Sequence, residues 1–277
     1  MTLQNQPIGV FDSGYGGLTI FKELTRQLPQ YDYIYLGDNA RTPYGSRSFE
    51  VVYQYTLEAV SWLFAQGCPL VILACNTASA KALRSIQQRD LPIIDPSRRV
   101  LGVIRPSVEV IPEITRSGHI GVLGTVGTIL SESYPLEIAK IAPERLLSVT
   151  QEACPMWVPI VENNEIETPG ADFFVKKNID NLFAKDNLID TVILGCTHYP
   201  LLSHVIRKYL PEGVTLLEQG TIVAGKLDDY LKRHPDMAVR CSKNQNRQFF
   251  TTESVEVFEQ RAGFFLGNEV NAIHIKL

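Results

Sequence analysis

The sequence predicts an α/β protein made of two similar, doubly wound parallel-sheet domains that face each other across a cleft. Short apolar runs alternate with amphipathic stretches along the 277 residues, as is typical of parallel strands joined by helices. Two of these runs share a pattern, because Val71–Ala80 (VILACNTASA) and Val192–Leu201 (VILGCTHYPL) both lead from Val-Ile-Leu to a cysteine. A second pair, Ile8–Gly14 (IGVFDSG) and Ile120–Gly127 (IGVLGTVG), occurs in the same order. The two pairs together predict two related halves.

The first domain is expected to cover residues 1–97 and to be completed by residues 213–277. Its early elements are the strand Ile8–Asp12, the helix Leu18–Gln27, the strand Tyr31–Gly37, the helix Phe49–Ala65 and the strand Pro69–Ala74. A strand from Val214 opens the returning segment, followed by the helix Thr221–Lys232, the strand Gln248–Thr251, the helix Val255–Leu266 and the strand Asn271–Lys276. Ligands of parallel sheets bind at the carboxyl ends of strands, where Asp12, Asp38 and Cys75 all fall. These three side chains can share a site.

The second domain is expected at residues 98–212, after a Pro- and Arg-rich crossover at residues 92–107. Its elements are the strand Ile120–Gly124, a helix from about Ser131, the strand Arg145–Thr150, the helix Gly170–Phe183, the strand Thr191–Leu194 and the helix Leu201–Tyr209. Cys196 ends a strand that corresponds to the strand before Cys75. We therefore expect one cysteine on each wall of the cleft.

The composition indicates an enzyme-sized globular protein that binds a small molecule. Hydrophobic residues make up 45% of the chain, which is ample for a core. The formal net charge is −4, with 26 Lys and Arg against 30 Asp and Glu, so nothing attracts the chain generally to nucleic acid or to an anionic membrane. We expect a small diffusible substrate, no nucleic-acid partner and no membrane partner, and a homodimer stays open.

The cytoplasm is the expected location. Residues 1–6 are polar and no run of about 18 apolar residues occurs, so the sequence shows neither a signal peptide nor a membrane span. The five cysteines are scattered without a CxxC pair, which fits neither a zinc ribbon nor a disulfide framework. We expect free thiols in a reducing compartment and no metal site.

Two facing thiols suggest proton transfer on the two faces of one carbon atom. This chemistry needs a base on one side and an acid on the other, and a thiolate and a thiol can exchange these roles. A free thiol has a pKa of about 8.5, so each sulfur needs a local activator. Asp12 is the candidate beside Cys75. The second half lacks a carboxylate at the matching position, so His198, close after Cys196, and Glu162 are the candidates there.

Each of these residues also has an ordinary structural interpretation. Free cysteines are among the most buried residue types, Asp12 could cap a helix, His198 could belong to the core and Glu162 could be a surface carboxylate. The glycines of Gly14–Gly17 resemble a dinucleotide-binding loop. Thr19, however, occupies the third glycine position of GxGxxG, so we expect no nicotinamide cofactor and no other cofactor.

The loop Asp38–Gly45 (DNARTPYG) is predicted to clamp the substrate. It is more polar and more specific in composition than a plain turn, although Asp-Asn and Pro-Tyr-Gly also form ordinary turns.

The sequence resembles the cofactor-independent aspartate/glutamate racemase family over most of its length. The resemblance rests on DSGYGG (Asp12–Gly17), DNARTPYG (Asp38–Gly45), ACNTASA (Ala74–Ala80), VPIVE (Val158–Glu162) and GCTHYPLL (Gly195–Leu202). It implies interconversion of L- and D-glutamate, with D-glutamate feeding bacterial peptidoglycan synthesis. It also implies that Cys75 acts on the D face with help from Asp12, and that Cys196 acts on the L face with help from His198 and Glu162.

Substrate contacts are also implied by this resemblance. They are Asp12, Ser13, Pro43, Tyr44, Gly45, Asn76, Thr77, Thr125, Thr197 and His198. Two segments depart from the family's usual pattern, Glu218–Gly220 and Arg105–Ser107, and we expect both to bear on domain packing or regulation. Three alternatives stay open: a racemase of aspartate or another amino acid, a thiol hydrolase that uses Cys196 and His198, and a non-catalytic amino-acid-binding protein.

Overall fold

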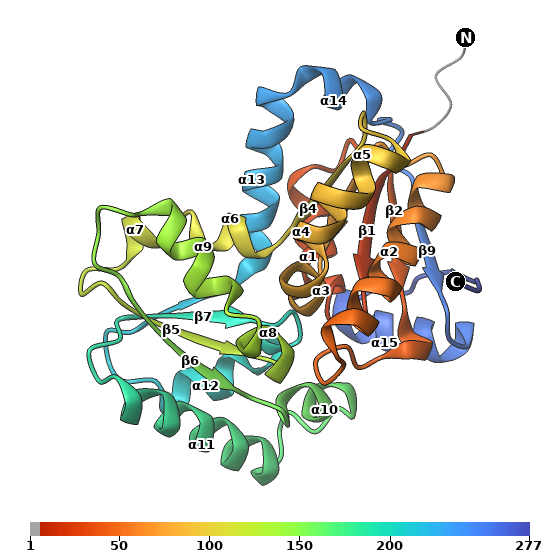
Figure 1. Ribbon diagram of the computed structural model, residues 1–277. Coiled ribbons are helices and arrows are strands. Elements are labelled where there is room, and N and C mark those ends of the chain that lie inside the picture. Colours follow the sequence, from red (N-terminus) through yellow and green to blue (C-terminus); the bar gives the residue numbers. More distant parts are fainter. Residues whose placement is uncertain (1–5) are drawn as a thin grey trace.

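The structure is a computed structural model that describes residues 6–277, with two parallel sheets in separate halves of the molecule (Figure 1). The larger sheet contains, in spatial order, β10 (Ala272–His274), β9 (Arg247–Thr251), β2 (Tyr33–Gly37), β1 (Ile8–Asp12), β3 (Leu70–Leu73) and β4 (Arg99–Gly102). The smaller sheet contains β6 (Ser148–Ala153), β5 (His119–Gly124), β7 (Thr191–Gly195) and β8 (Thr215–Leu217). All pairings are parallel, so the predicted α/β class with two parallel sheets is confirmed. Residues 1–5 of the polar N-terminal stretch lie outside the described part.

The two sheets repeat one arrangement of strands. The order β2-β1-β3-β4 in the larger sheet matches β6-β5-β7-β8 in the smaller one. The register matches as well, because Phe11 pairs with Leu73 in the first sheet and Leu123 pairs with Leu194 in the second. The residues that follow these strands therefore occupy corresponding positions, as the repeated sequence patterns predicted.

Two strands lie on the other side of the expected domain boundaries. The strand β4 follows the expected break at residues 97 and 98 but pairs with β3 of the first sheet. The strand β8 follows the expected break at residues 212 and 213 but pairs with β7 of the second sheet. The Pro- and Arg-rich composition before β4 concealed this short strand, and the crossover between the halves begins only after Gly102.

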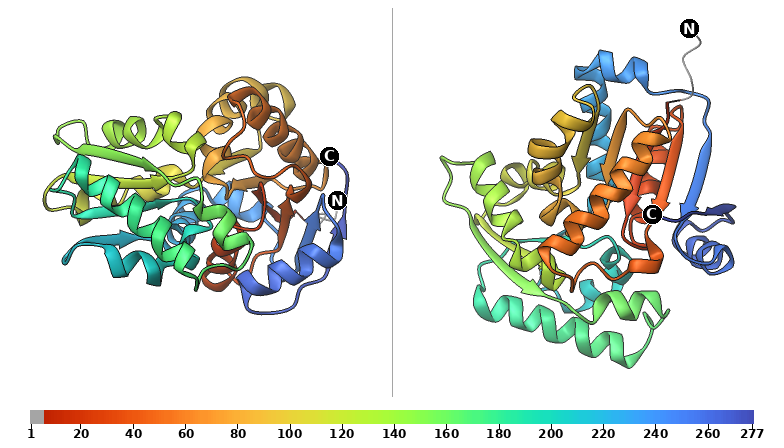
Figure 2. Two further views of the ribbon diagram at one scale, coloured as in Figure 1. Left: turned by 90° about the horizontal axis from the view of Figure 1, so that it is seen from below. Right: turned by 45° about the vertical axis from the view of Figure 1, so that its right-hand side comes forward.

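Helices of very different length connect the strands. The first half contains α1 (Leu18–Gln27), α2 (Phe49–Ala65), α3 (Asn76–Lys81), α4 (Leu83–Ser85), α5 (Leu91–Ile94), α14 (Pro235–Arg240) and α15 (Val255–Leu266). The second half contains α7 (Ile111–Ile114), α8 (Val126–Leu130), α9 (Ser133–Ile141), α10 (Trp157–Glu162), α11 (Pro169–Lys185) and α12 (Ser203–Tyr209). Two further helices, α6 (Ile104–Val108) and α13 (Gln219–Arg233), lie between the halves, and α13 packs on both α1 and α6 (Figure 1). The two halves lie side by side when viewed from below (Figure 2, left).

Local sequence explains where the main helices begin and what they bury. Ser48 caps α2, because its side chain accepts a hydrogen bond from Val51 N, and Ser254 caps α15 in the same way. The helix α1 buries Leu18, Phe21 and other apolar side chains against the sheet. Between residues 6 and 277, no helix combines the length and apolar character needed to cross a membrane.

Candidate active site

The carboxyl ends of β1 and β3 bring Asp12, Ser13 and Cys75 together. Asp12 is the last residue of β1, and the following Ser13 Oγ lies 3.3 Å from Cys75 Sγ. Cys75 occupies the N-cap position of α3, where its sulfur accepts a hydrogen bond from Ala78 N at 3.4 Å. Only 1% of Asp12 and 6% of Cys75 is exposed. The first thiol is thus buried and held by two hydrogen-bond partners.

Asp12 is poised to exchange a proton or to bind a cationic group. Its Oδ2 accepts a hydrogen bond from Gly14 N at 2.8 Å, and its buried Oδ1 has no hydrogen-bond partner among the described residues. An unpaired buried acceptor costs roughly 1–3 kcal/mol, which a ligand that donates a hydrogen bond to it would recover. Burial raises the pKa of Asp12. Burial, together with the nearby charge of Asp12, also raises the pKa of Cys75 to about 12.

A buried chain of groups leads to the second thiol. Cys196 Sγ lies 3.9 Å from His198 Nδ1, and His198 Nε2 lies 3.0 Å from Glu162 Oε1. Burial acts to lower the pKa of His198, but its interactions with Cys196 and Glu162 outweigh burial and raise the pKa to about 10. The two ring nitrogens of His198 thus face a sulfur on one side and a carboxylate oxygen on the other. The ring of Phe265 on α15 packs edge-on against the imidazole.

Glycine allows the two halves to approach closely at this site. A Cβ atom on Gly16 would lie 2.3 Å from His198 Nδ1 and 2.4 Å from Thr197 Oγ1, so only glycine fits there. Thr19 Oγ1 donates a hydrogen bond across the same junction to Thr197 O at 3.0 Å. Burial and the charge of Asp12 are the main causes that raise the pKa of Cys75, and the charge of Cys196 adds to them.

Hydroxyl groups and the predicted clamp loop join the halves on the other side of the site. Thr77 Oγ1 of the first half lies 3.0 Å from Thr125 Oγ1 of the second. Gly127 N donates to the Gly45 carbonyl oxygen at 2.7 Å. The phenol of Tyr44 is buried and donates to Asp38, and Pro43 before it is exposed. The loop is thus joined to the second half through the backbone of Gly45.

The structure brings most of the predicted residues to this junction and adds some that sequence reasoning missed. Tyr134 and Gln219 hydrogen-bond to Asn76 from α9 and α13. Arg261 on α15 reaches Glu162 at 4.0 Å and stacks over the ring of Tyr15. No local motif marks these residues, although the segment containing Gln219 was recognised as unusual.

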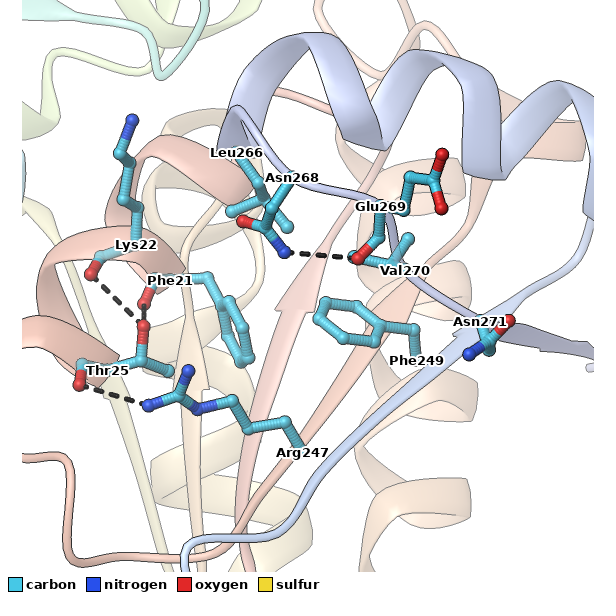
Figure 3. Close-up of a pocket in the computed structure, with 10 residues that line it drawn as sticks. All are labelled: Phe21, Lys22, Thr25, Arg247, Phe249, Leu266, Asn268, Glu269, Val270 and Asn271. Carbon is cyan, nitrogen blue, oxygen red and sulfur yellow. Dashed lines mark hydrogen bonds between the residues drawn. The ribbon is translucent and has the colours of Figure 1, made fainter.

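A cavity of about 280 Å³ lies elsewhere on the first half, between α1, β9 and the segment after α15 (Figure 3). Its lining includes Lys22, Arg247 and Phe249, whereas the thiols and the residues predicted to contact substrate do not line it. The predicted chemistry therefore belongs to the junction of the two halves and not to this cavity.

Comparison with known proteins agrees with this geometry. The glutamate racemase of Persephonella marina is 38% identical over 98% of this chain and 97% of its own. A crystal structure of a glutamate racemase from Bacillus anthracis superposes with a TM-score of 0.88 at 39% identity, covering 98% of each chain. The glutamate racemase of Francisella tularensis, solved in complex with D-glutamate, has a TM-score of 0.86 at 32% identity and also covers 98% of each chain.

A sequence model of one family matches residues 8–227, a range that includes both thiols and all their predicted helpers. With these full-length relatives, the match establishes that the chain belongs to the Asp/Glu/Hydantoin racemase family.

Proposed function

We propose that the protein is an isomerase that interconverts L- and D-glutamate through two thiols, Cys75 and Cys196. The observation that carries this proposal is the matching position of the two cysteines after corresponding strands of two sheets, each beside a group that can hold a proton. The full-length relatives named above are glutamate racemases, which supports glutamate as the substrate. Such an activity supplies D-glutamate for peptidoglycan, as the family resemblance implies.

Proton transfer balances without any cofactor. In the L-to-D direction, the Cys196 thiolate takes the α-proton, and the Cys75 thiol donates its proton to the opposite face of the same carbon. The product leaves with Cys196 as a thiol and Cys75 as a thiolate, which is the state needed for the reverse reaction. His198 stabilises the Cys196 thiolate and is held by Glu162, while Asp12 assists proton exchange at Cys75.

Substrate is held by uncharged donors in this proposal. These donors are the hydroxyl groups of Ser13, Thr77, Thr125 and Thr197 and the amide of Asn76, and all except Thr125 are at most 9% exposed. Charge-assisted hydrogen bonds to the two carboxylates of glutamate compensate for the loss of their hydration. Asp12 Oδ1, which has no hydrogen-bond partner among the described residues, is a suitable acceptor for the α-ammonium group.

Solvent deuterium provides the test. In D₂O and without pyridoxal phosphate, flavin or metal, the protein should racemise glutamate and place deuterium on its α-carbon. Aspartate and an ester substrate serve as controls, because faster turnover of aspartate would favour an aspartate racemase. An acyl-enzyme burst with the ester would instead favour a thiol hydrolase. Glutamate that stays unexchanged, or an activity lost to a chelator, would refute the proposal.

A homodimer and a cytoplasmic location are also part of this proposal. Three apolar side chains of α8 and α9 are exposed, Val126 at 37%, Leu130 at 75% and Leu136 at 53%, and contact between two copies at these helices would remove them from water. All five cysteines are free, which suits a reducing compartment. Sedimentation of the wild type and of Leu130→Asp tests the dimer, and a monomeric wild type would contradict it.

A further inference from the structure

A closed ring of three buried side chains lies where the two halves meet, and the chemistry above gives a role to only one of them, Asn76. It consists of Asn76 on α3, Tyr134 on α9 and Gln219 at the start of α13, none more than 2% exposed. Asn76 Nδ2 donates to Gln219 Oε1 at 2.7 Å, Gln219 Nε2 donates to Tyr134 OH at 2.9 Å, and the Tyr134 hydroxyl donates to Asn76 Oδ1 at 2.8 Å. The ring thus connects the residue after Cys75 to both the second half and the helix between the halves.

The neighbours of Gln219 determine which way its amide points. Gln219 Nε2 lies 2.7 Å from Ser107 Oγ and 3.3 Å from the Val103 carbonyl oxygen. Ser107 already donates its own hydrogen to Val103 O at 2.7 Å, so its oxygen can accept from Gln219. A carbonyl group only accepts, and therefore the Gln219 atom that faces Val103 must be the nitrogen. This leaves Gln219 Oε1 facing Asn76.

The orientation of Gln219 determines the orientation of Asn76. An amide carries two N–H donors on one atom and two lone pairs on the other, and the ring uses one of each from Asn76. Burial raises the pKa of Tyr134, so its hydroxyl stays protonated and can donate to Asn76. The second N–H of Asn76 stays available to a carboxylate. If the Asn76 amide were reversed, it would present an oxygen where the nitrogen now lies, and that oxygen would repel a carboxylate.

We propose that Gln219 is a positioning residue for racemisation, which holds the Asn76 amide with its nitrogen available to substrate and ties α3 to the second half through Tyr134. This inference rests on the proposed function, because it uses Asn76 as a substrate contact. Gln219 itself acts only through Asn76 and Tyr134.

The experiment compares Gln219→Met with a matched control, Asn178→Leu. Methionine keeps the length of the side chain but removes both donors and the acceptor. Asn178 is also a buried amide, 7% exposed, and donates to Glu152 Oε1 at 2.9 Å within the second half. Gln219→Met should lower kcat/KM about 10-fold for both enantiomers, mostly through KM, because a single hydrogen bond to a charged ligand is weakened. Asn178→Leu should lower the melting temperature but leave kcat/KM within about twofold of the wild type.

A double-mutant cycle separates positioning from general loosening of the fold. If Gln219 acts through Asn76, adding Gln219→Met to Asn76→Ala should cost little beyond Asn76→Ala alone. Tyr134→Phe removes only the Tyr134 hydroxyl from the hydrogen-bonded ring. It replaces Gln219→Met in the cycle if that variant does not fold, and it should show the same non-additive pattern. Fully additive losses, or wild-type kinetics in Gln219→Met, would overturn the inference about Gln219. The proposed function would still stand in that case, provided that the wild type racemises glutamate. A wild type that does not racemise glutamate would overturn both.

Discussion

Asp12→Asn tests whether the two thiols are served by separate helpers. The substitution keeps the size of the side chain and an oxygen acceptor for Gly14 N, which now lies 2.8 Å from Asp12 Oδ2. It removes the carboxylate whose charge acts on Cys75. The fold should therefore persist, while proton transfer at Cys75 should become slower.

Two opposing effects determine the size of this change. A positioned acid or base contributes about 10²- to 10⁴-fold to a proton transfer. The charge of Asp12 also raises the pKa of Cys75, so its removal eases formation of the thiolate and offsets part of the loss. We therefore expect a decrease in kcat/KM near the lower limit, about 10²-fold, which corresponds to about 2.7 kcal/mol in the barrier.

The two enantiomers have equal free energy, so kcat/KM must decrease equally in both directions, and directional rates alone reveal nothing about individual thiols. Isotope effects do. When transfer at Cys75 limits the rate, α-deuterated D-glutamate should show a larger primary isotope effect on kcat/KM in Asp12→Asn than in the wild type. The effect with α-deuterated L-glutamate should shrink, because abstraction by Cys196 no longer limits the rate. The assay is racemisation followed by circular dichroism with each deuterated enantiomer.

His198→Asn provides the reciprocal control, since His198 Nδ1 lies 3.9 Å from Cys196 Sγ. It should enlarge the isotope effect for L-glutamate and reduce that for D-glutamate. Equal isotope effects for both enantiomers in both variants would refute the assignment of separate helpers and leave these side chains with structural roles only.

The other predictions concern the thiols and two titrating groups. Cys75→Ala and Cys196→Ala should each abolish racemisation, and racemase activity in either variant would contradict the mechanism. Cys68 is a buried cysteine outside the site, so Cys68→Ala should stay active but lose about 1 kcal/mol or more of stability in urea unfolding. Burial acts to lower the pKa of His198, but its partners raise it to about 10, whereas the pKa in the unfolded chain is about 6.5. The contribution of His198 to the free energy of unfolding is therefore complete below about pH 6.5 and is lost as the pH rises through about 10. The difference in the free energy of unfolding between wild type and His198→Asn should therefore shrink from pH 6 to pH 10, by about the contribution that is lost when His198 is deprotonated. A difference that stays constant over this range would be the contrary result. Burial acts to raise the pKa of Asp190, but four hydrogen-bond donors outweigh burial and lower it. Asp190→Asn should therefore lower the free energy of unfolding by about 1–3 kcal/mol at pH 7. Urea unfolding should show a progressively smaller cost as the pH falls below about 4.

The elements that the sequence predicted best are helices with a strong apolar pattern. The bounds of the helices Leu18–Gln27, Phe49–Ala65 and Val255–Leu266 agree with the structure, and serines cap the last two. The strand expected at Arg145–Thr150 instead runs over Ser148–Ala153, because pairing with β5 begins only at His119 and Ser148. Apolar residues before that point, such as the exposed Leu146, mimic a strand in sequence but have no partner strand. Pairing of strands is a tertiary property that local composition does not contain.

The site shows the same limit in its polar groups. Motifs after strands predicted Asp12, Cys75 and Cys196, because the carboxyl ends of parallel strands are where such sheets present side chains. The ring through Tyr134 and Gln219 depends on how α9 and α13 approach α3, and no sequence pattern expresses that approach. Single-sequence reasoning thus predicted where Asp12, Cys75 and Cys196 lie in the sheets but not the ring of side chains around Asn76.

The groups beside the two thiols differ in kind. Gly124 ends β5 at the position where Asp12 ends β1, and an added Cβ there would lie 2.9 Å from Ile129 Cδ1, the end of a side chain that would have to shift. The second strand thus ends without a carboxylate. His198 instead reaches Cys196 from the residues after β7, held by Glu162, and Gly16 leaves the space that its ring requires. The equal free energies of the two enantiomers require only that kcat/KM is the same in both directions. They do not require the proton transfers at Cys75 and Cys196 to be alike, so two thiols at matching positions can have chemically different partners.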